Sequence, residues 1–341
     1  MTTTLAPVDL LKATPSNDQP VIALSEGSDP RVVAGALAAV EAQLANVILV
    51  GPIAEVEAAL EAVGGSVGGS DLSIHDPAVS ELTDEFATAF YELRKHKGID
   101  QNAARKAVKS PLVYAAMLVR CGHATGTVGG AVATTSDVVR TAIQVIGMAP
   151  DAAMVSSFFL MYPPESAENG RAMLYSDCGL VIDPSAQELA AIATASAHSC
   201  RSLLRSEPKI AMLSFSTMGS ARHAAVDKVT TATAALRADQ PGLCVDGEMQ
   251  FDAAFVPSVG QNKAPGSQVA GQANVMIFPN LDAGNIGYKL TQRLGGYAAI
   301  GPVLQGLAKP ANDLSRGCSA EDVTQMIAVT VLQSPRTGDG I

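Results

Sequence analysis

The sequence predicts an α/β protein of two domains, in which helices cover largely parallel sheets. Three observations support this fold class. The chain has 341 residues, about twice the usual size of one domain. Short apolar runs of strand length alternate with helical patterns along most of the chain. This strand–helix–strand order is typical of parallel sheets, because their crossover connections are usually helices.

The first elements show the pattern most clearly. Val21–Leu24 is predicted to be a short buried strand, and Asn46–Val50 the next one. Between them, Asp29-Pro30 gives a helix start, since an aspartate caps a helix and proline fits its first turn. Four apolar residues then recur at helical spacing and are expected on one buried face: Val33, Leu37, Val40 and Leu44.

A long helix is predicted over residues 78–97, with one apolar face and Gly98 as its C-terminal cap. Its apolar face consists of Leu82, Phe86, Phe90 and Leu93. The last turn carries the basic run 94–97, which also complements the helix dipole. Residues 112–119 are apolar over the length of a buried helix.

The second half of the chain continues the alternation. Strands are predicted over residues 155–161, 172–176, 209–215 and 274–278, and a final helix over 319–333. Residues 64–70 (GGSVGGS) and 163–170 are predicted to be loops, and the Gly301-Pro302 and Lys309-Pro310 pairs to break the chain. The domain boundaries fall near 147 and 300. The first domain is therefore discontinuous (1–147 plus 300–341), and the second covers 148–299.

Composition excludes several classes of function. The net charge of −10 argues against nucleic-acid binding, which needs a basic surface. No apolar run is long enough to span a bilayer, and residues 1–18 lack the regions of a signal peptide. The five cysteines are scattered without a C-x-x-C pair, which argues against a disulfide framework and structural zinc. A cytoplasmic location is therefore expected.

The stretch 301–322 (GPVLQGLAKPANDLSRGCSAED) holds the residues most suited to chemistry. Ser319 and Asp322 have the spacing of a capping box at the start of the last helix. Asp313, Ser315 and Arg316 lie just before it, and a helix N-terminus beside an arginine suits a phosphate. Alternatively, Asp322 only caps the helix and Arg316 is solvated; spacing alone favours this second interpretation.

The string GLAKPANDLSRGCS, from Gly306, resembles the C-terminal signature of the phosphate acetyltransferase and phosphate butyryltransferase family. Further segments resemble its other motifs in order: 90–98, 136–140, 212–217, 263–267 and 284–289. The matches extend over nearly the whole chain and are closer to the acetyl branch. The resemblance implies two doubly wound α/β domains with a cleft between them, as in isocitrate and isopropylmalate dehydrogenases.

The resemblance also implies a reaction. Acetyl-CoA and phosphate would be interconverted with acetyl phosphate and CoA in a ternary complex, by direct attack of the CoA thiolate. Asp322 corresponds to the base that takes the thiol proton, Arg316 to the phosphate anchor, and Ser315 to a group that stabilises the tetrahedral intermediate. No permanently bound cofactor and no metal are expected. CoA and acetyl-CoA enter as substrates, with phosphate and acetyl phosphate as the other small-molecule partners, and the family resemblance implies a homodimer.

Three more arginines match family positions that hold CoA or the anionic substrate: Arg94, Arg140 and Arg293. Without the resemblance, the favoured interpretation of Arg94 is a cation at a helix end, and that of Arg293 is an exposed helix residue. Residues 134–136 (Thr-Thr-Ser) either cap the helix that carries Arg140 or line a phosphate pocket.

Two departures from the family pattern put the acyl preference in question. Residues 129–133 read Gly-Gly-Ala-Val-Ala, where the family commonly has Ser-Gly and then a histidine, and Met218 replaces a common lysine. The alternatives are transfer of longer acyl groups (propionyl or butyryl) and a catalytically silent acyl-CoA-sensing module. A decarboxylating dehydrogenase is a further alternative, but the sequence lacks the paired aspartates that its metal requires.

Overall fold

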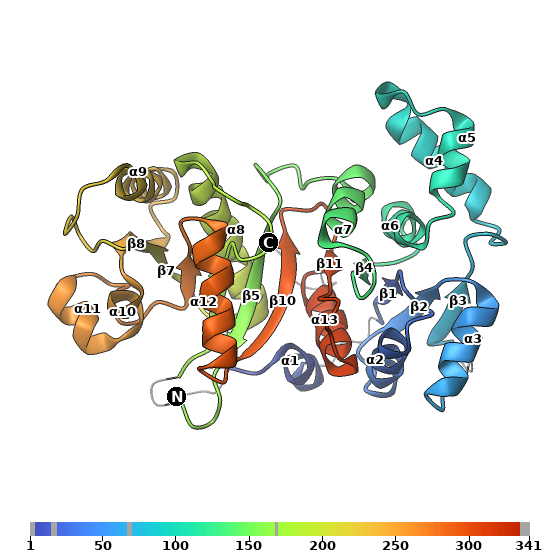
Figure 1. Cartoon of the computed structure of the whole chain (residues 1–341), viewed down its shortest axis with the longest axis horizontal. Helices are drawn as coiled ribbons and strands as arrows, with labels where there is room; N and C mark the ends of the chain where they lie inside the picture. Colours follow the sequence, from blue (N-terminus) through green and yellow to red (C-terminus); the bar gives the residue numbers. More distant parts are fainter. Residues whose placement is uncertain (1–3, 15–18, 67–69, 168–169, 335–341) are drawn as a thin grey trace. The chain divides into compact units, whose positions relative to one another are not determined.

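The computed structural model describes residues 4–14, 19–66, 70–167 and 170–334 (Figure 1). These divide into two compact units, which are described separately. Unit 1 holds residue 4 and residues 151–306, and unit 2 holds residues 5–150 and 307–334. The predictions for residues 1–18, 64–70 and 163–170 lie in part outside the described residues.

Unit 2 is built on a five-stranded parallel sheet in the order β11-β4-β1-β2-β3. Its strands are β1 (Val21–Leu24), β2 (Asn46–Val50), β3 (Leu72–His75), β4 (Gly126–Gly129) and β11 (Ala311–Asp313). The central strands are almost wholly buried, which explains their unbroken apolar sequences. The prediction of the first two strands is confirmed, since β1 and β2 have the expected bounds.

Helices cover both faces of this sheet. Figure 1 shows α6 (Pro111–Cys121) on one side, with α2 (Pro30–Glu41) and α13 (Ala320–Leu332) on the other. The remaining helices are α1 (Pro7–Ala13), α3 (Ile53–Ala62), α4 (Thr83–Arg94), α5 (Gln101–Ala107) and α7 (Thr135–Thr141), which a π-helical turn extends to Ile146. Residues 112–119 lie inside α6 and are mostly buried, as predicted.

The buried face of α2 differs from the predicted one. Val33 is fully buried, but Leu37 and Val40 are only partly so, and Leu44 lies beyond the end of the helix. The small residues Gly35, Ala36 and Ala39 are buried instead. A Cβ atom at Gly35 would lie 2.6 Å from the Val323 Cβ atom. The reason is therefore the close approach of α13, which small residues permit.

The predicted helix over 78–97 is shorter in the structure. Residues 76–80 form a turn in which the Asp76 carboxylate accepts a hydrogen bond from the Ala78 amide at 2.8 Å. Such side-chain bonds compete with helix formation, so α4 begins only at Thr83. Lys95–Lys97 form a 3₁₀ turn, and Gly98 ends it at φ 81°, as predicted for a C-terminal glycine.

Unit 1 contains a six-stranded mixed sheet in the order β10-β5-β6-β9-β7-β8. Its strands are β5 (Ser156–Tyr162), β6 (Met173–Ser176), β7 (Lys209–Leu213), β8 (Cys244–Met249), β9 (Val275–Ile277) and β10 (Ala298–Gln305). β5 runs antiparallel to both of its neighbours, and the other pairs are parallel. The four strands predicted here are confirmed to within two residues at each end.

Five helices accompany this sheet: α8 (Ala186–Leu204), α9 (Ala224–Asp239), α10 (Phe251–Phe255), α11 (Pro257–Lys263) and α12 (Leu281–Arg293). α8 and α9 pack on the parallel strands, and α12 packs on β10, β5 and β6.

The prediction that Gly301-Pro302 breaks the chain is wrong. Both residues lie within β10, where a bulge between Ile300 and Val303 shifts the register against β5. Proline lacks an N–H donor, but an edge strand with a bulge accommodates it. β10 therefore belongs to the sheet of unit 1, which extends to Gly306. Lys309-Pro310 does lie outside regular structure, just before β11.

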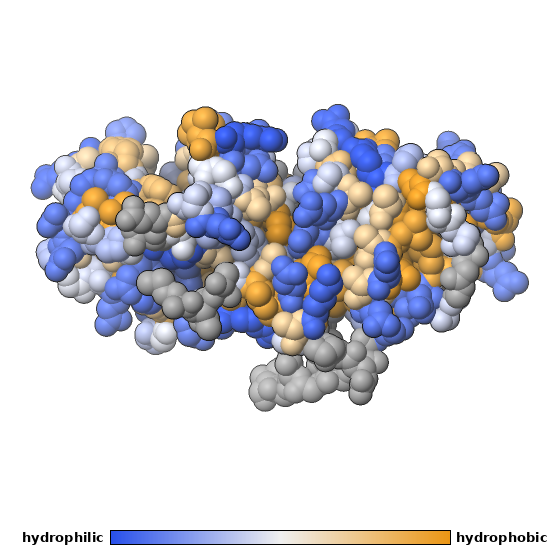
Figure 2. Space-filling model, turned by 90° about the horizontal axis from the view of Figure 1, so that it is seen from below, coloured by the Kyte–Doolittle hydropathy of each residue, from blue (hydrophilic) through white to orange (hydrophobic). Residues whose placement is uncertain are grey.

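Hydrophilic and apolar residues are interspersed over the face of the molecule seen in Figure 2. Among the described residues, no helix combines the length and apolar character needed to cross a bilayer.

Candidate active site

The strand order of unit 2 brings three loops together at the carboxyl ends of its strands. From β1 the chain continues to β2 and β3 on one side, whereas β4 and β11 lie on the other side. The direction of winding therefore changes between β1 and β4. The segments that follow the carboxyl ends of β1, β4 and β11 are residues 25–29, 130–134 and 314–319. Ligands of open α/β sheets bind at such a switch point.

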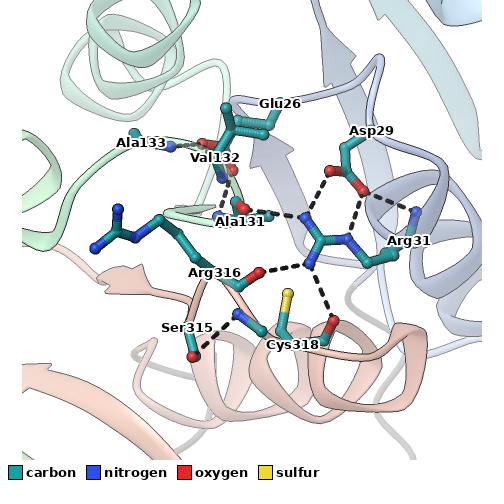
Figure 3. Close-up of polar contacts among 10 residues, drawn as sticks. Glu26, Asp29, Arg31, Ala131, Val132, Ala133, Ser315, Arg316 and Cys318 are labelled. Atoms are coloured by element: carbon teal, nitrogen blue, oxygen red, sulfur yellow. Dashed lines mark hydrogen bonds and ion pairs between the residues drawn. The ribbon is translucent and has the colours of Figure 1, made fainter.

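Glu26 fixes the second of these loops. Its carboxylate accepts hydrogen bonds from the backbone amides of Ala131 at 2.6 Å, Val132 at 3.0 Å and Ala133 at 2.6 Å (Figure 3). Three amides of consecutive residues thus point at one carboxylate. No local pattern in the sequence predicts this role of Glu26.

Arg31 joins all three loops through its guanidinium group. Nη1 donates to the carbonyl oxygens of Arg316 at 2.7 Å and Cys318 at 3.3 Å, and Nη2 donates to the carbonyl oxygen of Ala131 at 3.0 Å. Nε and Nη2 also bind the Asp29 carboxylate at 3.0 and 2.7 Å (Figure 3). This bond to Arg31 lowers the pKa of the Asp29 carboxyl.

The paired carboxylate also caps α2, as predicted: Asp29 accepts the backbone amide of Arg31 at 2.9 Å. One short run, Glu26-Gly-Ser-Asp-Pro-Arg31, therefore supplies both the cap and the connections among the loops. The sequence signal for this role is the position of the run, because a charged segment directly between a buried strand and a helix indicates a functional loop.

The three residues predicted to be catalytic lie on the third loop and the first turn of α13. Ser315 and Arg316 are exposed. Arg31 holds the backbone carbonyl of Arg316, whereas the Arg316 side chain extends away from Arg31 (Figure 3). The Asp322 carboxylate Oδ2 accepts the Ser319 amide at 2.8 Å and its hydroxyl at 3.0 Å. The predicted capping box is therefore confirmed.

The three predicted anion-binding arginines lie elsewhere. Arg140 is exposed on α7 and pairs with Asp137 at 3.0 Å. Arg94 ends α4, and its buried Nε has no hydrogen-bond partner within the described part of the chain. Arg293 ends α12 and belongs to unit 1, where it is exposed. Ser315, Arg316 and Asp322 are thus neighbours in one segment, whereas Arg94 and Arg140 occupy other helices of unit 2.

Two threonines at the start of α7 have different roles. Thr134 caps the helix, because its hydroxyl accepts the Asp137 amide at 3.2 Å. The Thr135 hydroxyl instead donates to Oδ2 of Asp313 at 2.6 Å. Asp313 ends β11 and is fully buried. Burial, together with the negative charge of Glu26, raises the pKa of Asp313 to about 7.

A family model described as "Phosphate acetyl/butaryl transferase" matches residues 8–331. The chain belongs to this family. It is 49% identical over 315 residues to the phosphate acetyltransferase of Paracoccus denitrificans, a match that covers 92% of this chain and 94% of the relative. A solved phosphotransacetylase from Streptococcus pyogenes superposes with a TM-score of 0.88 at 42% identity, covering 96% of this chain and 97% of that one.

The similarity to more distant structures concerns the fold alone. A 4-hydroxythreonine-4-phosphate dehydrogenase from Klebsiella pneumoniae matches with a TM-score of 0.55 at 13% identity, over 93% of this chain and all of that one. The predicted dehydrogenase-like α/β fold is confirmed, as is the resemblance to the transferase family. The chain is an enzyme of the acyltransferase class.

The departures from the usual family pattern have structural counterparts. Ser25 is buried, and its hydroxyl has no hydrogen-bond partner among the residues that the structure describes. A Cβ atom at Gly129 would lie 2.3 Å from this hydroxyl oxygen, so Ser25 occupies the space that a side chain at position 129 would need. The other departure, Met218, is exposed in unit 1 in a loop after β7, with φ 48°.

Cys318 lies between the functional residues of the third loop and α13. Burial raises the pKa of its thiol, which keeps it in the unreactive protonated form. Within the described ranges, no group of three or more His, Cys, Asp or Glu side chains is arranged to hold a metal ion. The acidic cluster that the dehydrogenase hypothesis requires is therefore not among these residues.

Proposed function

We propose that this transferase interconverts acetyl-CoA and phosphate with acetyl phosphate and CoA. The observation that carries the proposal is its similarity to phosphate acetyltransferases over nearly the whole chain. The site chemistry agrees, since a hydroxyl, a guanidinium group and a carboxylate lie within one eight-residue segment, 315–322. The substrates are small molecules, and we propose that no cofactor is bound permanently.

In the direction of acetyl-CoA formation, Asp322 takes the proton of the CoA thiol, and the thiolate attacks the carbonyl carbon of acetyl phosphate. A positioned carboxylate assists this step because the thiol is largely protonated at neutral pH. Both hydrogen bonds that Asp322 accepts from the described residues through its side chain end on Oδ2. Oδ1 is therefore the oxygen assigned to the thiol.

Arg316 and Ser315 stabilise the negative charge of the reacting groups. The Arg316 carbonyl is fixed by Arg31 while its side chain extends outward, so the guanidinium group can bind two phosphate oxygens. The Ser315 hydroxyl donates to the oxyanion that develops on the carbonyl oxygen.

We assign Arg94, Arg140 and Arg293 to the anionic groups of CoA or phosphate. The unpartnered Nε of Arg94 supports this role. The exposed ion pair of Arg140 with Asp137 contributes little stability, so a phosphate can replace Asp137.

The test is thioester formation from acetyl phosphate and CoA, followed by ultraviolet absorbance without added divalent metal. We expect robust activity with acetyl phosphate. Propionyl and butyryl phosphates are tested in the same assay, because Met218 and Gly129 differ from the common family residues. A preference for longer acyl groups would give higher rates with these two substrates. A folded protein that forms no thioester from any of the three would instead support the silent, acyl-CoA-sensing alternative.

We also propose a homodimer formed through unit 1. Three exposed apolar side chains recur at helical spacing on α12 and at the residue that follows it: Ile286 (58% exposed), Leu290 (52%) and Leu294 (83%). The backbone of exposed Ile182 pairs with the start of this helix. A light-scattering measurement is expected to give twice the chain mass. Leu290→Glu with Leu294→Glu should give a monomer, whereas Val79→Glu, at an exposed site in unit 2, should not. A monomeric wild type would contradict the proposal.

The five cysteines are all free in the structure. This suits a reducing compartment, and we propose a cytoplasmic location.

A further inference from the structure

Asp313 has no explanation in the roles assigned so far. It is fully buried at the end of β11, two residues before Ser315. Among the described residues, its Oδ2 accepts one hydrogen bond, from Thr135, and its Oδ1 has no partner. The backbone of Gly130 covers this second oxygen, since a Cβ atom at position 130 would lie 2.1 Å from it. Buried carboxylates are costly when they lack hydrogen bonds or a paired cation.

A second buried aspartate of the same chain shows what a structural carboxylate looks like. Asp177 in unit 1 accepts four hydrogen bonds. They come from the amide and hydroxyl of Ser157 and from the amides of Gly179 and Leu180. These donors bind both oxygens of the carboxylate. Among the described residues, Asp313 has one side-chain donor, Thr135, and the lowering of its pKa by Thr135 and by the Leu314 amide is smaller than the rise caused by burial.

Among the charged groups around Asp313, Glu26 is the one that raises its pKa. β4, α7 and α13 pack against β11. β4 carries no charged residue, and the charged residues nearest Asp313 on α7, Asp137 and Arg140, pair with each other at the surface. The first turn of α13 contributes two acidic residues, Glu321 and Asp322. Glu26, after β1, adds a negative charge that raises the pKa of Asp313 further, and burial makes the largest contribution to its rise to about 7.

The hydrogen bond to Thr135 connects this buried acid with the surface. Thr135 is exposed. When Asp313 is ionised, the threonine hydroxyl donates to it. When Asp313 is protonated, the carboxyl can donate to the Thr135 oxygen, and the hydroxyl hydrogen is then available to an anion outside.

We propose that Asp313 is a positioning residue that holds a proton for the phosphate group and delivers it through the Thr135 hydroxyl. The inference rests on the proposed function. In the direction of acetyl-CoA formation, the bond between the acyl carbon and the phosphate oxygen breaks and its electron pair stays on that oxygen. The oxygen takes a proton from Thr135, which takes one from Asp313. Phosphate thus leaves as the dianion and not as the strongly basic trianion.

The proton balance closes over one turnover. The thiol proton goes to Asp322 and from there to water, and Asp313 regains a proton from water. In the opposite direction, phosphate gives its proton to Thr135 and Asp313 as it attacks the thioester. Protonated Asp313 is required only for acyl-CoA formation.

The test compares the pH dependence of kcat/KM for acetyl-CoA formation in wild type, Asp313→Asn, Thr135→Val and Thr135→Ser. Wild-type activity is expected to fall as pH rises through about 7, because the protonated form is active and Asp313 loses its proton there. Asp313→Asn should no longer show this fall in activity at high pH. Its kcat should be about 100-fold lower than that of the wild type, within the usual range for proton transfer by a side chain. Thr135→Val should lose a similar amount, and Thr135→Ser should keep both. All four proteins are assayed with the same substrates, so ionisation of the substrates affects the four pH profiles equally.

A limb that persists unchanged in Asp313→Asn, or wild-type rates in Thr135→Val, would overturn the inference. Folding is checked separately through Tm. Since the pKa of Asp313 is raised in the folded protein, ionisation destabilises that state, and the wild type should lose stability relative to Asp313→Asn between pH 4 and pH 8. A difference in Tm that stays constant over this range also overturns it.

Failure of the proposed function has a different signature. In that case the wild type forms no thioester, and inorganic phosphate becomes the probe. The rise in Tm caused by phosphate should be smaller at pH 8 than at pH 6 in the wild type, because ionised Asp313 holds the Thr135 hydrogen. In Asp313→Asn the phosphate effect should change less over this pH range. Equal changes in both proteins would reject the role of Asp313 independently of turnover.

Discussion

Arg316→Gln is expected to lower kcat for acetyl-CoA formation by about 100-fold to 1,000-fold, the usual cost of losing one group that stabilises developing charge. Glutamine retains a donor but loses the positive charge and the two-pronged geometry. The Arg316 backbone, which Arg31 binds, is unchanged by this substitution, so the loop should keep its conformation. Arg105→Gln, which removes an exposed ion pair with Asp84 in the same unit, is the matched control and should retain full activity.

Asp322→Asn tests the proposed base in the same segment. The role of Asp322 as a base can be separated from its role as a helix cap. The variant should lose orders of magnitude in kcat if Asp322 is the base. Ser319→Ala removes the hydroxyl that caps the helix but leaves the carboxylate, and should cost about 1 kcal/mol of stability with little change in kcat. Equal kinetic losses in both variants would mean that Asp322 acts only as a cap. Near-normal turnover of folded Arg316→Gln would likewise contradict the role of Arg316.

Arg31→Met is expected to affect both stability and turnover. It leaves the Asp29 carboxylate and the carbonyls of Ala131, Arg316 and Cys318 without their shared donor. Hydrogen bonds to a charged group contribute about 1.5–3 kcal/mol each when well formed, but the side chain is 36% exposed and water can replace part of them. We expect a loss of about 2–3 kcal/mol in the free energy of unfolding, measured by urea titration.

The kinetic effect of Arg31→Met should be larger than this loss of stability suggests. Arg31 does not reach the substrate in our proposal; it fixes the carbonyl of Arg316. A displacement of about 1 Å at a binding group can reduce turnover about 100-fold. Arg31→Lys retains the charge but not the five directed donors, so it should recover part of the stability and little of kcat. Full turnover in Arg31→Met, despite lower stability, would show that the loop holds Arg316 without it.

Much of the fold could be predicted because its determinants are local. β1 and β2 are continuous apolar runs, and the caps at Asp29 and Ser319 are formed by residues that lie within three positions of their partners. The length of α4 was overestimated because the Asp76 turn competes with the helix at its start. The buried face of α2 was misassigned because it depends on α13, which follows almost 300 residues later.

The candidate site was predictable only in part for the same reason. Ser315, Arg316 and Asp322 are contiguous and match a family motif, so the sequence pointed to them. Arg31 acquires its role from carbonyl groups that lie about 100 and 285 positions away. The burial of Asp313 likewise depends on strands and helices from distant parts of the chain. No local pattern marks such residues, and the fold alone brings their partners together.

The split composition of unit 2 has a consequence for synthesis on the ribosome. Apart from residue 4, unit 1 is one continuous segment, 151–306, and its whole sheet can form once that segment has emerged from the ribosome. Unit 2 is completed only later, because its outer strand β11 and the helix that covers Gly35 come from residues 307–334, which are translated after unit 1. Domains fold as units during synthesis. While unit 1 is being translated, the N-terminal part of unit 2 therefore has an incomplete sheet, and its helix α2 is not yet covered by α13. It is the part of the nascent protein that most needs protection from aggregation.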